Sequence, residues 1–191
     1  MAPRRPKHAG RDRSLEAELK FRLTGAADHA RLRRRLREVK AASEGAYDEE
    51  NLRFVVPSKS KVSLRLRILD GGKPGIITTK SPARFDHGIK VREETEVEVA
   101  DAATARDLLE SLGYPVEFIF HKHRASWLID GVSVTLDTLD FGFFIELEGP
   151  PEALPEAAKL LGLNPKQAIR QSYSAMAREH LRDQKKLAAR S

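Results

Sequence analysis

The chain has 191 residues, a length that suits one domain with a buried core and is too short for two full domains. It contains no cysteine, which excludes disulfide bonds, thiolate metal sites and a cysteine nucleophile. The net charge of +6, from 34 basic and 28 acidic residues, favours anionic partners such as phosphorylated metabolites or nucleic acid. Because no apolar run could span a bilayer or serve as a signal peptide, we expect a soluble, cytoplasmic protein without a membrane partner.

The helical segments are indicated by apolar residues at helical spacing. Residues 1–13 are basic and lack such a pattern, so we expect a disordered basic tail there, followed by a single domain over residues 14–191. Within that domain we predict helices over residues 27–42, 101–112, 152–161 and 165–187. The arginines of the first helix have no aromatic residues between them, which favours a solvated helix face over a nucleic-acid surface.

The segments between the helices alternate charged and apolar residues with the period of a strand. We predict eight strands, over residues 15–23, 47–55 (the weakest pattern), 62–68, 76–80, 89–99, the stretch after Pro115, 132–137 and 141–148. One face of this set carries seven basic residues, namely Lys20, Arg65, Arg67, Lys80, Arg92, Lys122 and Arg124. The same face carries seven acidic residues, namely Glu16, Glu18, Glu94, Glu96, Asp137, Glu146 and Glu148.

The charged faces either point to solvent or enclose an interior. For one strand alone, a solvated polar face is the ordinary arrangement. If all the charged faces pointed outward, however, the apolar faces would fill the barrel and the amphipathic helices would have no apolar sheet surface to cover. We therefore predict an α+β fold in which an eight-stranded antiparallel closed β-barrel keeps a charged, hydrated tunnel inside and apolar faces under flanking helices.

An interior with charges of both signs suits a phosphate chain together with a metal ion. Arginine forks and lysine ammonium groups bind phosphate oxygens. The carboxylates would repel phosphate unless a hard divalent cation lay between them, and Mg²⁺ or Mn²⁺ accepts ligands from both.

Short motifs along the chain resemble those of the CYTH superfamily, also called the triphosphate tunnel metalloenzymes. Glu16-Ala-Glu18-Leu-Lys20 is similar to its Glu-x-Glu-x-Lys signature. The resemblance continues in order through Leu64-Arg65-Leu66-Arg67, Thr79-Lys80, Arg92-Glu-Glu94-Thr-Glu96, Leu112-Gly113, Lys122-His-Arg124, Leu136-Asp137 and Gly142-Phe-Phe144-Ile-Glu146-Leu-Glu148. It implies a tunnel in which basic residues bind a triphosphate and acidic residues hold one or two Mg²⁺ or Mn²⁺ ions.

The residues and the resemblance together assign expected roles. Substrate binding is expected from Arg65, Arg67, Lys80, Lys122 and Arg124. Metal binding is expected from Glu16, Glu18, Asp137, Glu146 and Glu148, and less definite catalytic roles in the tunnel from Lys20, Arg92, Glu94 and Glu96. His121 and His123 fall on the opposite face of their strand, so we expect them to be structural or exposed, while Asp48 is either a further site residue or a turn residue.

The leading function is metal-dependent hydrolysis of inorganic tripolyphosphate or an organic triphosphate, which makes the chain a triphosphatase. One alternative is a class IV type of adenylate cyclase, which makes cyclic AMP from ATP in the same kind of tunnel. A second is a noncatalytic polyphosphate-binding module, and a third is a basic RNA-binding protein, which the lack of aromatic residues between the arginines disfavours. The sequence leaves open the substrate, the preferred metal and the oligomeric state, a homo-oligomer included.

Overall fold

A computed structural model describes residues 13–57 and 59–189 of the chain, with side chains from Leu15 onward. The predicted basic tail lies outside the described residues except for Arg13, which begins the first strand.

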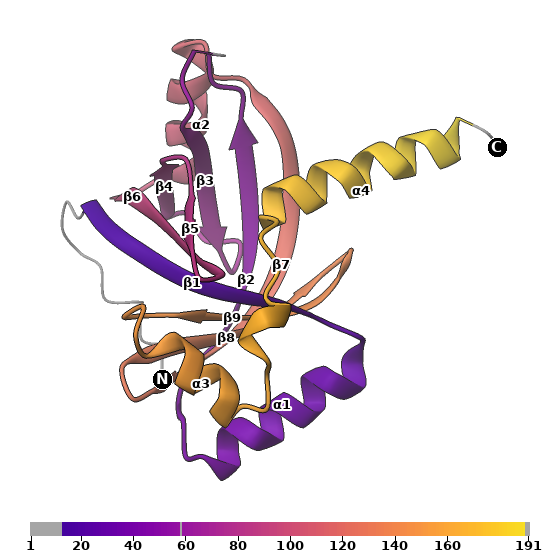
Figure 1. Cartoon of the computed structure of the whole chain (residues 1–191). Coiled ribbons are helices and arrows are strands. Elements are labelled where there is room, and N and C mark those ends of the chain that lie inside the picture. Colours follow the sequence, from indigo (N-terminus) through magenta and orange to yellow (C-terminus); the bar gives the residue numbers. More distant parts are fainter. Residues whose placement is uncertain (1–12, 58, 190–191) are drawn as a thin grey trace.

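Within the described residues, nine strands form one antiparallel sheet, and eight of them close into a barrel (Figure 1). Around the barrel the order is β1-β9-β8-β7-β2-β3-β4-β6, and β6 pairs with β1 to complete it. The short β5 pairs with β6 alone. The strands are β1 Arg13–Leu23, β2 Ala42–Phe54, β3 Ser63–Leu69, β4 Gly75–Lys80, β5 Arg84–Asp86, β6 Ile89–Val99, β7 Val116–Ile129, β8 Val132–Leu139 and β9 Gly142–Glu148. The predicted eight-stranded closed barrel is confirmed, and β5 is an addition that the sequence pattern did not reveal.

Strand β1 closes the barrel by pairing with different neighbours along its length. Its first half, through Glu18, pairs with β6, whereas the half from Glu18 to Leu23 pairs with β9. Glu18 therefore has Lys90 opposite it on one side and Glu148 opposite it on the other. Side chains directly opposite each other in antiparallel strands approach closely, so this register brings charged groups from three strands together.

Most of the apolar strand residues point outward and are covered by helices, as predicted, whereas Leu15, Val97 and Leu128 stay exposed. Helices α1 (Ala26–Glu38) and α3 (Leu154–Leu160) pack beside each other against β1, β8 and β9 (Figure 1). Leu32 and Leu36 of α1 are fully buried there. Helix α2 (Ala102–Ser111) packs against β3 and β4, with Ala102 beside Leu66. Each large apolar side chain buried in this way contributes about 1.5–3 kcal/mol.

The last predicted helix is wrong in its first part. Instead of one helix over residues 165–187, the chain forms a short 3₁₀ turn η1 (Pro165–Gln167), an extended segment, and helix α4 (Tyr173–Ala188). In the extended segment the Ile169 N–H donates to the Lys20 carbonyl at 2.7 Å, which ties the chain to the barrel rim. The Ser172 side chain then accepts from the Ala175 N–H, so α4 begins at the mouth of the barrel and projects away from it (Figure 1).

Helix α1 is also shorter than predicted, and β2 begins earlier. The helix ends at Glu38, and Lys40 adopts a left-handed backbone conformation with φ of 56°. Strand β2 starts at Ala42 because it pairs along most of the long β7, with a bulge between Ser43 and Gly45. No helix in the described ranges is both long and apolar enough to cross a membrane.

Candidate functional site: a charged tunnel

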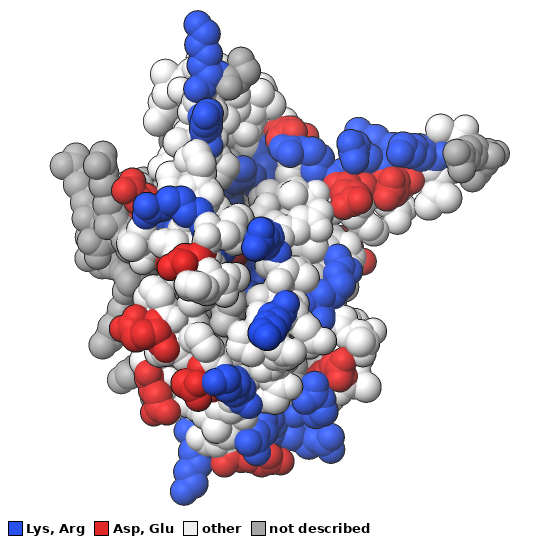
Figure 2. Space-filling model, viewed as in Figure 1, with Lys and Arg blue, Asp and Glu red and all other residues white. Residues whose placement is uncertain are grey.

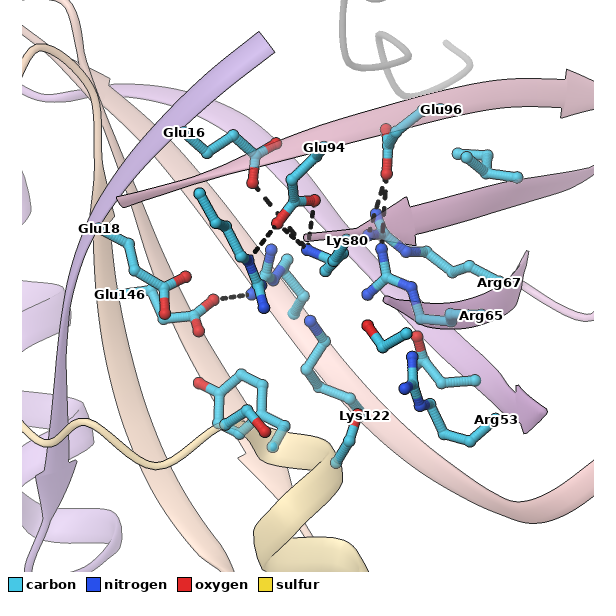
Figure 3. A pocket seen from close by; sticks show the side chains of 18 of the residues that line it. Glu16, Glu18, Arg53, Arg65, Arg67, Lys80, Glu94, Glu96, Lys122 and Glu146 are labelled. Atoms are coloured by element: carbon cyan, nitrogen blue, oxygen red, sulfur yellow. Dashed lines mark hydrogen bonds and ion pairs between the residues drawn. The ribbon is translucent and has the colours of Figure 1, made fainter. Parts of the chain in front are cut away.

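The barrel encloses a cavity of about 1060 Å³ that is lined largely by charged side chains (Figure 3). All but one of the predicted site residues line it, namely Glu16, Glu18, Lys20, Arg65, Arg67, Lys80, Arg92, Glu94, Glu96, Lys122, Arg124, Glu146 and Glu148. They come from β1, β3, β4, β6, β7 and β9, so the alternation of each strand places its charges in one shared interior.

Asp137 is the exception, because it lies beneath the cavity wall instead of lining it. It is fully buried and accepts two hydrogen bonds from Arg124, from Nε at 2.7 Å and from Nη2 at 2.6 Å. The Tyr173 hydroxyl donates to it at 2.8 Å. Such a two-pronged arginine pair fixes the planar guanidinium, so these contacts suit a residue that positions Arg124. The role of Asp137 as a metal ligand stays a prediction, and both of its oxygens are already engaged by Arg124 and Tyr173.

One side of the cavity, called the basic wall, carries Arg65 and Arg67 of β3 and Lys122 and Arg124 of β7. A further buried carboxylate, Glu49 of β2, organises this wall. It is 1% exposed and lies 3.0 Å from Lys122 Nζ, 3.8 Å from Arg67 Nε and 4.0 Å from Arg124 Nε. The Asn51 amide donates to it at 3.1 Å. Burial alone would raise the pKa of Glu49, but the nearby cations, Lys122 first, outweigh burial and hold the pKa well below its ordinary value. Glu49 therefore stays ionised and holds three cations in place.

Sequence reasoning missed Glu49, as well as Arg53, Lys90 and Tyr173, all of which contribute to the interior. For the β2 residues the signal was weak: Tyr47, Glu49, Asn51 and Arg53 share one face of the strand, but Asp48 and Glu50 make the other face polar as well. Lys90 shares the parity of the other inward residues of β6, and its Nζ donates to Glu18 at 2.7 Å.

The acidic wall is built by neighbouring residues of β1 and β9. Lys20 Nζ lies 3.0 Å from Glu146 and 3.5 Å from Glu18, so these two carboxylates are neutralised by lysine. Glu16 and Glu148 are not: the nearest ion-pair partner of Glu16 is Lys80 at 3.9 Å, and within the described residues Glu148 has no cation inside 4.0 Å. Burial, followed by a hydrogen bond with Glu94, raises the pKa of Glu16 to about 9. Burial also raises the pKa of Glu148, and the negative charges of Glu146 and Glu18 add to that rise.

Opposite these acids, the arginines of β3 are only loosely paired. Arg65 lies 3.5 Å from Glu96, and Arg67 lies 3.8 Å from Glu49 and 3.9 Å from Glu96, whereas Arg92 Nε donates to Glu94 at 2.7 Å. Lys80 also pairs with Glu94, yet burial, with the charge of Arg65 next, lowers the pKa of Lys80 to about 8. Figure 3 shows these side chains pointing toward one another across the cavity. Because their carboxylate partners lie at 3.5 to 3.9 Å, the guanidinium groups of Arg65 and Arg67 are the cations of this wall that a bound anion can contact at the lowest cost in existing ion pairs.

The histidines and Asp48 lie outside the tunnel, as expected for the histidines. His123 Nδ1 is 2.7 Å from Asp48 and His121 Nε2 is 3.4 Å from Glu50, and all four side chains are exposed on the outer surface. Asp48 accordingly has a surface role and is not a site residue.

The donor chemistry of the acidic wall fits a hard divalent cation. Its four glutamates (Glu16, Glu18, Glu146 and Glu148) supply the carboxylate oxygens that Mg²⁺ and Mn²⁺ prefer. Within the described residues, Glu16 and Glu148 have no cation closer than 3.9 Å to offset their negative charge. Within the described part of the chain, however, no three acidic or histidine side chains are already grouped closely enough to hold a metal. Metal binding would therefore require Glu18 and Glu146 to turn away from their lysine and arginine partners.

Fold and site together define a closed antiparallel barrel whose interior cavity carries a basic wall and an acidic wall. The family model of the CYTH domain matches residues 14–173, and the chain belongs to this family. The resemblance first drawn from short motifs is therefore confirmed over most of the chain.

Solved structures share this fold. The PH1819 protein of Pyrococcus horikoshii OT3 is 28% identical, with a TM-score of 0.69 over 86% of this chain and 99% of that one. The PH1012 protein of the same organism is 25% identical, with a TM-score of 0.70 over 83% and 96%. HpAC1 of Hippeastrum, described as an adenylyl cyclase candidate with a dominant triphosphatase activity, is 21% identical, with a TM-score of 0.67 over 86% of this chain and 96% of that one. At this identity the likeness supports a shared fold and nothing more. A search of curated proteins gives no match.

Proposed function

We propose that this protein binds a triphosphate inside the tunnel and hydrolyses it with the help of Mg²⁺ or Mn²⁺. The observation that carries the proposal is the mismatch between the two walls. Arg65 and Arg67 are held by carboxylates at 3.5 to 3.9 Å, while Glu16 and Glu148 face them with no cation nearer than 3.9 Å among the residues that the structure describes. A polyanion and a divalent cation bound together would supply the missing partner to each wall.

The basic wall binds and orients the phosphates. Phosphate oxygens would replace Glu96 on Arg65 and Arg67, because a two-pronged, charge-assisted contact is stronger than an ion pair at 3.5 to 3.9 Å. Lys122 and Arg124 contact the phosphate chain of the substrate from β7. Buried Glu49 keeps Lys122 in place, and buried Asp137 keeps Arg124 in place. The side chains are thus fixed before the substrate arrives, which lowers the free energy lost on binding.

The acidic wall prepares the attacking water. Glu16, Glu18, Glu146 and Glu148 are the residues that would hold the metal, which when bound would neutralise charge on the phosphoryl oxygens. A carboxylate of this wall accepts a proton from water while the water oxygen forms a bond to phosphorus. The phosphoanhydride bond breaks, and the leaving phosphate departs with its charge stabilised by the arginines and lysines. No protein nucleophile is needed.

The direct test uses the purified chain with inorganic triphosphate or ATP, in the presence of Mg²⁺, Mn²⁺ or EDTA. We expect phosphate release with either metal and none with EDTA. Release of cyclic AMP from ATP with little phosphate would favour the cyclase instead. Equal binding of triphosphate with and without EDTA, with no cleavage, would favour a polyphosphate-binding module.

An RNA-binding function is less well supported. On the face in Figure 2, basic and acidic side chains are interspersed and do not form a continuous basic stripe. The arginines of α1 are exposed, and Arg31 and Arg35 pair with acidic residues of the same helix. This pattern is typical of a solvated helix face.

A further inference from the structure

Arg53, near the end of β2, is a buried cation in the tunnel without a counter-ion. It is 7% exposed and lines the cavity. Within the described residues no carboxylate lies within 4.0 Å of it, and its Nε has no hydrogen-bond partner. Every other arginine or lysine that lines the cavity has a carboxylate inside that distance. Leaving one charge buried and unpaired is strongly unfavourable, so a residue of this kind points to a missing anion.

The surroundings of Arg53 place it beyond the group expected to hold the triphosphate. In the β2–β3 register Arg53 stands opposite Arg65, and like charges in that relation repel. Figure 3 shows Arg67, Arg65 and Arg53 along one wall of the cavity. Burial lowers the pKa of Arg53 to about 10, and the charges that act on it next are those of Glu117 and Arg178, at the mouth where α4 begins.

The first turn of α4 adds positive potential at the same place. Ser174 and Ala175 of this turn line the cavity, and a helix of 16 residues presents a partial positive charge at its N-terminus. The cavity volume of about 1060 Å³ is at the upper end for ligand pockets, which leaves room beyond a triphosphate.

We propose that Arg53 forms a further anion subsite at the α4 end of the tunnel, which binds an additional phosphate group and extends the preferred substrate to a linear inorganic polyphosphate longer than three phosphates. A neutral leaving group, such as a nucleoside, would leave the guanidinium unpaired. This inference rests on the proposed function, because it assigns the substrate class of the same tunnel.

The test compares inorganic triphosphate with linear inorganic tetraphosphate, on wild-type protein and on Arg53→Met. Binding is measured by calorimetry in EDTA, and kcat/KM is measured with Mg²⁺. We expect wild type to prefer tetraphosphate by about tenfold or more, the size of one charge-assisted contact, and Arg53→Met to treat both alike. Arg53→Lys should restore only part of the preference, because it keeps the charge without the planar fork. Arg178→Met is the matched control: it removes a positive charge from the same mouth, but one already paired with Glu117 at 2.7 Å, and it should keep the preference.

Thermal unfolding separates a binding role from a structural one. Without ligand, Arg53→Met should melt at the same temperature as wild type or higher, because it removes an unpaired buried charge. A lower melting temperature would indicate a structural role and overturn the inference, as would an equal preference for both compounds in wild type. If wild type neither binds nor cleaves either compound, the proposed function itself fails.

Discussion

Glu49 offers a sharp test of how the tunnel is held together, through the substitution Glu49→Gln. The amide keeps the shape of the side chain and an oxygen that can still accept from Asn51, but it removes the negative charge. Lys122, Arg67 and Arg124 would then lose the buried carboxylate that they share at 3.0, 3.8 and 4.0 Å.

The expected loss follows from the burial of this cluster. Removing one partner of a buried ion pair destabilises a protein by about 3–5 kcal/mol, because the remaining charge is left without compensation. The neighbouring substitution Glu50→Gln is a matched control, since it makes the same chemical change on the outer face. Among the residues that the structure describes, Glu50 pairs only with exposed His121, at 3.4 Å, and a pair of that kind contributes about 0–1 kcal/mol.

Urea unfolding of the two variants at neutral pH measures the difference directly. The contribution of Glu49 also has a defined pH dependence: since its pKa is depressed in the folded state, the stabilisation is complete above its ordinary value of 4.5 and is lost as the pH falls below it. Glu49→Gln should lack that part of the acid-induced loss. Equal free energies of unfolding for Glu49→Gln and Glu50→Gln would refute the description of Glu49 as the centre of the basic wall.

Substitutions in the acidic wall, at the start of α4 and among the β3 arginines give three further predictions. Because burial raises the pKa of Glu16 to about 9, the folded protein loses stability as pH rises from 4.5 toward 9, and Glu16→Gln should flatten that fall in metal-free melting curves. Tyr173→Phe should lower the free energy of unfolding by about 1.5–3 kcal/mol in urea titrations, since it removes a hydrogen bond to the buried Asp137 carboxylate that pairs with Arg124; no change would contradict this role. Arg65→Gln should raise the KM for triphosphate about tenfold or more in phosphate-release assays, while Arg33→Gln, on the exposed face of α1, should not.

The parity of the strands could be predicted from the sequence because alternation is a local property of the backbone. In β1 the charged Glu16, Glu18 and Lys20 point inward and Leu19 packs under α1, as the pattern indicates. A shift of one residue would exchange the two faces, so a strongly alternating strand leaves little freedom. The closed barrel and most of the tunnel lining follow from that constraint.

The features that were missed depend on contacts between distant segments. Strand β2 carries polar residues on both faces, with Glu49 inside and Asp48 and Glu50 outside, so its pattern shows no contrast to read. The enclosure of Asp137 depends on the register that sets Arg124 opposite it and on Tyr173 reaching it from α4. The break before α4 likewise depends on the Ile169 bond to the rim, which helical periodicity does not report.

The central claim is that one enclosed interior binds a triphosphate on its basic wall and a metal on its acidic wall. A crystal structure of the protein soaked with inorganic triphosphate and Mn²⁺ tests it most directly, with data collected at the manganese absorption edge. We predict an anomalous peak beside Glu16, Glu18, Glu146 and Glu148, and phosphate density contacting Arg65 and Arg67. Triphosphate bound only to the outer arginines of α1, with no manganese inside the barrel, would contradict the proposed function.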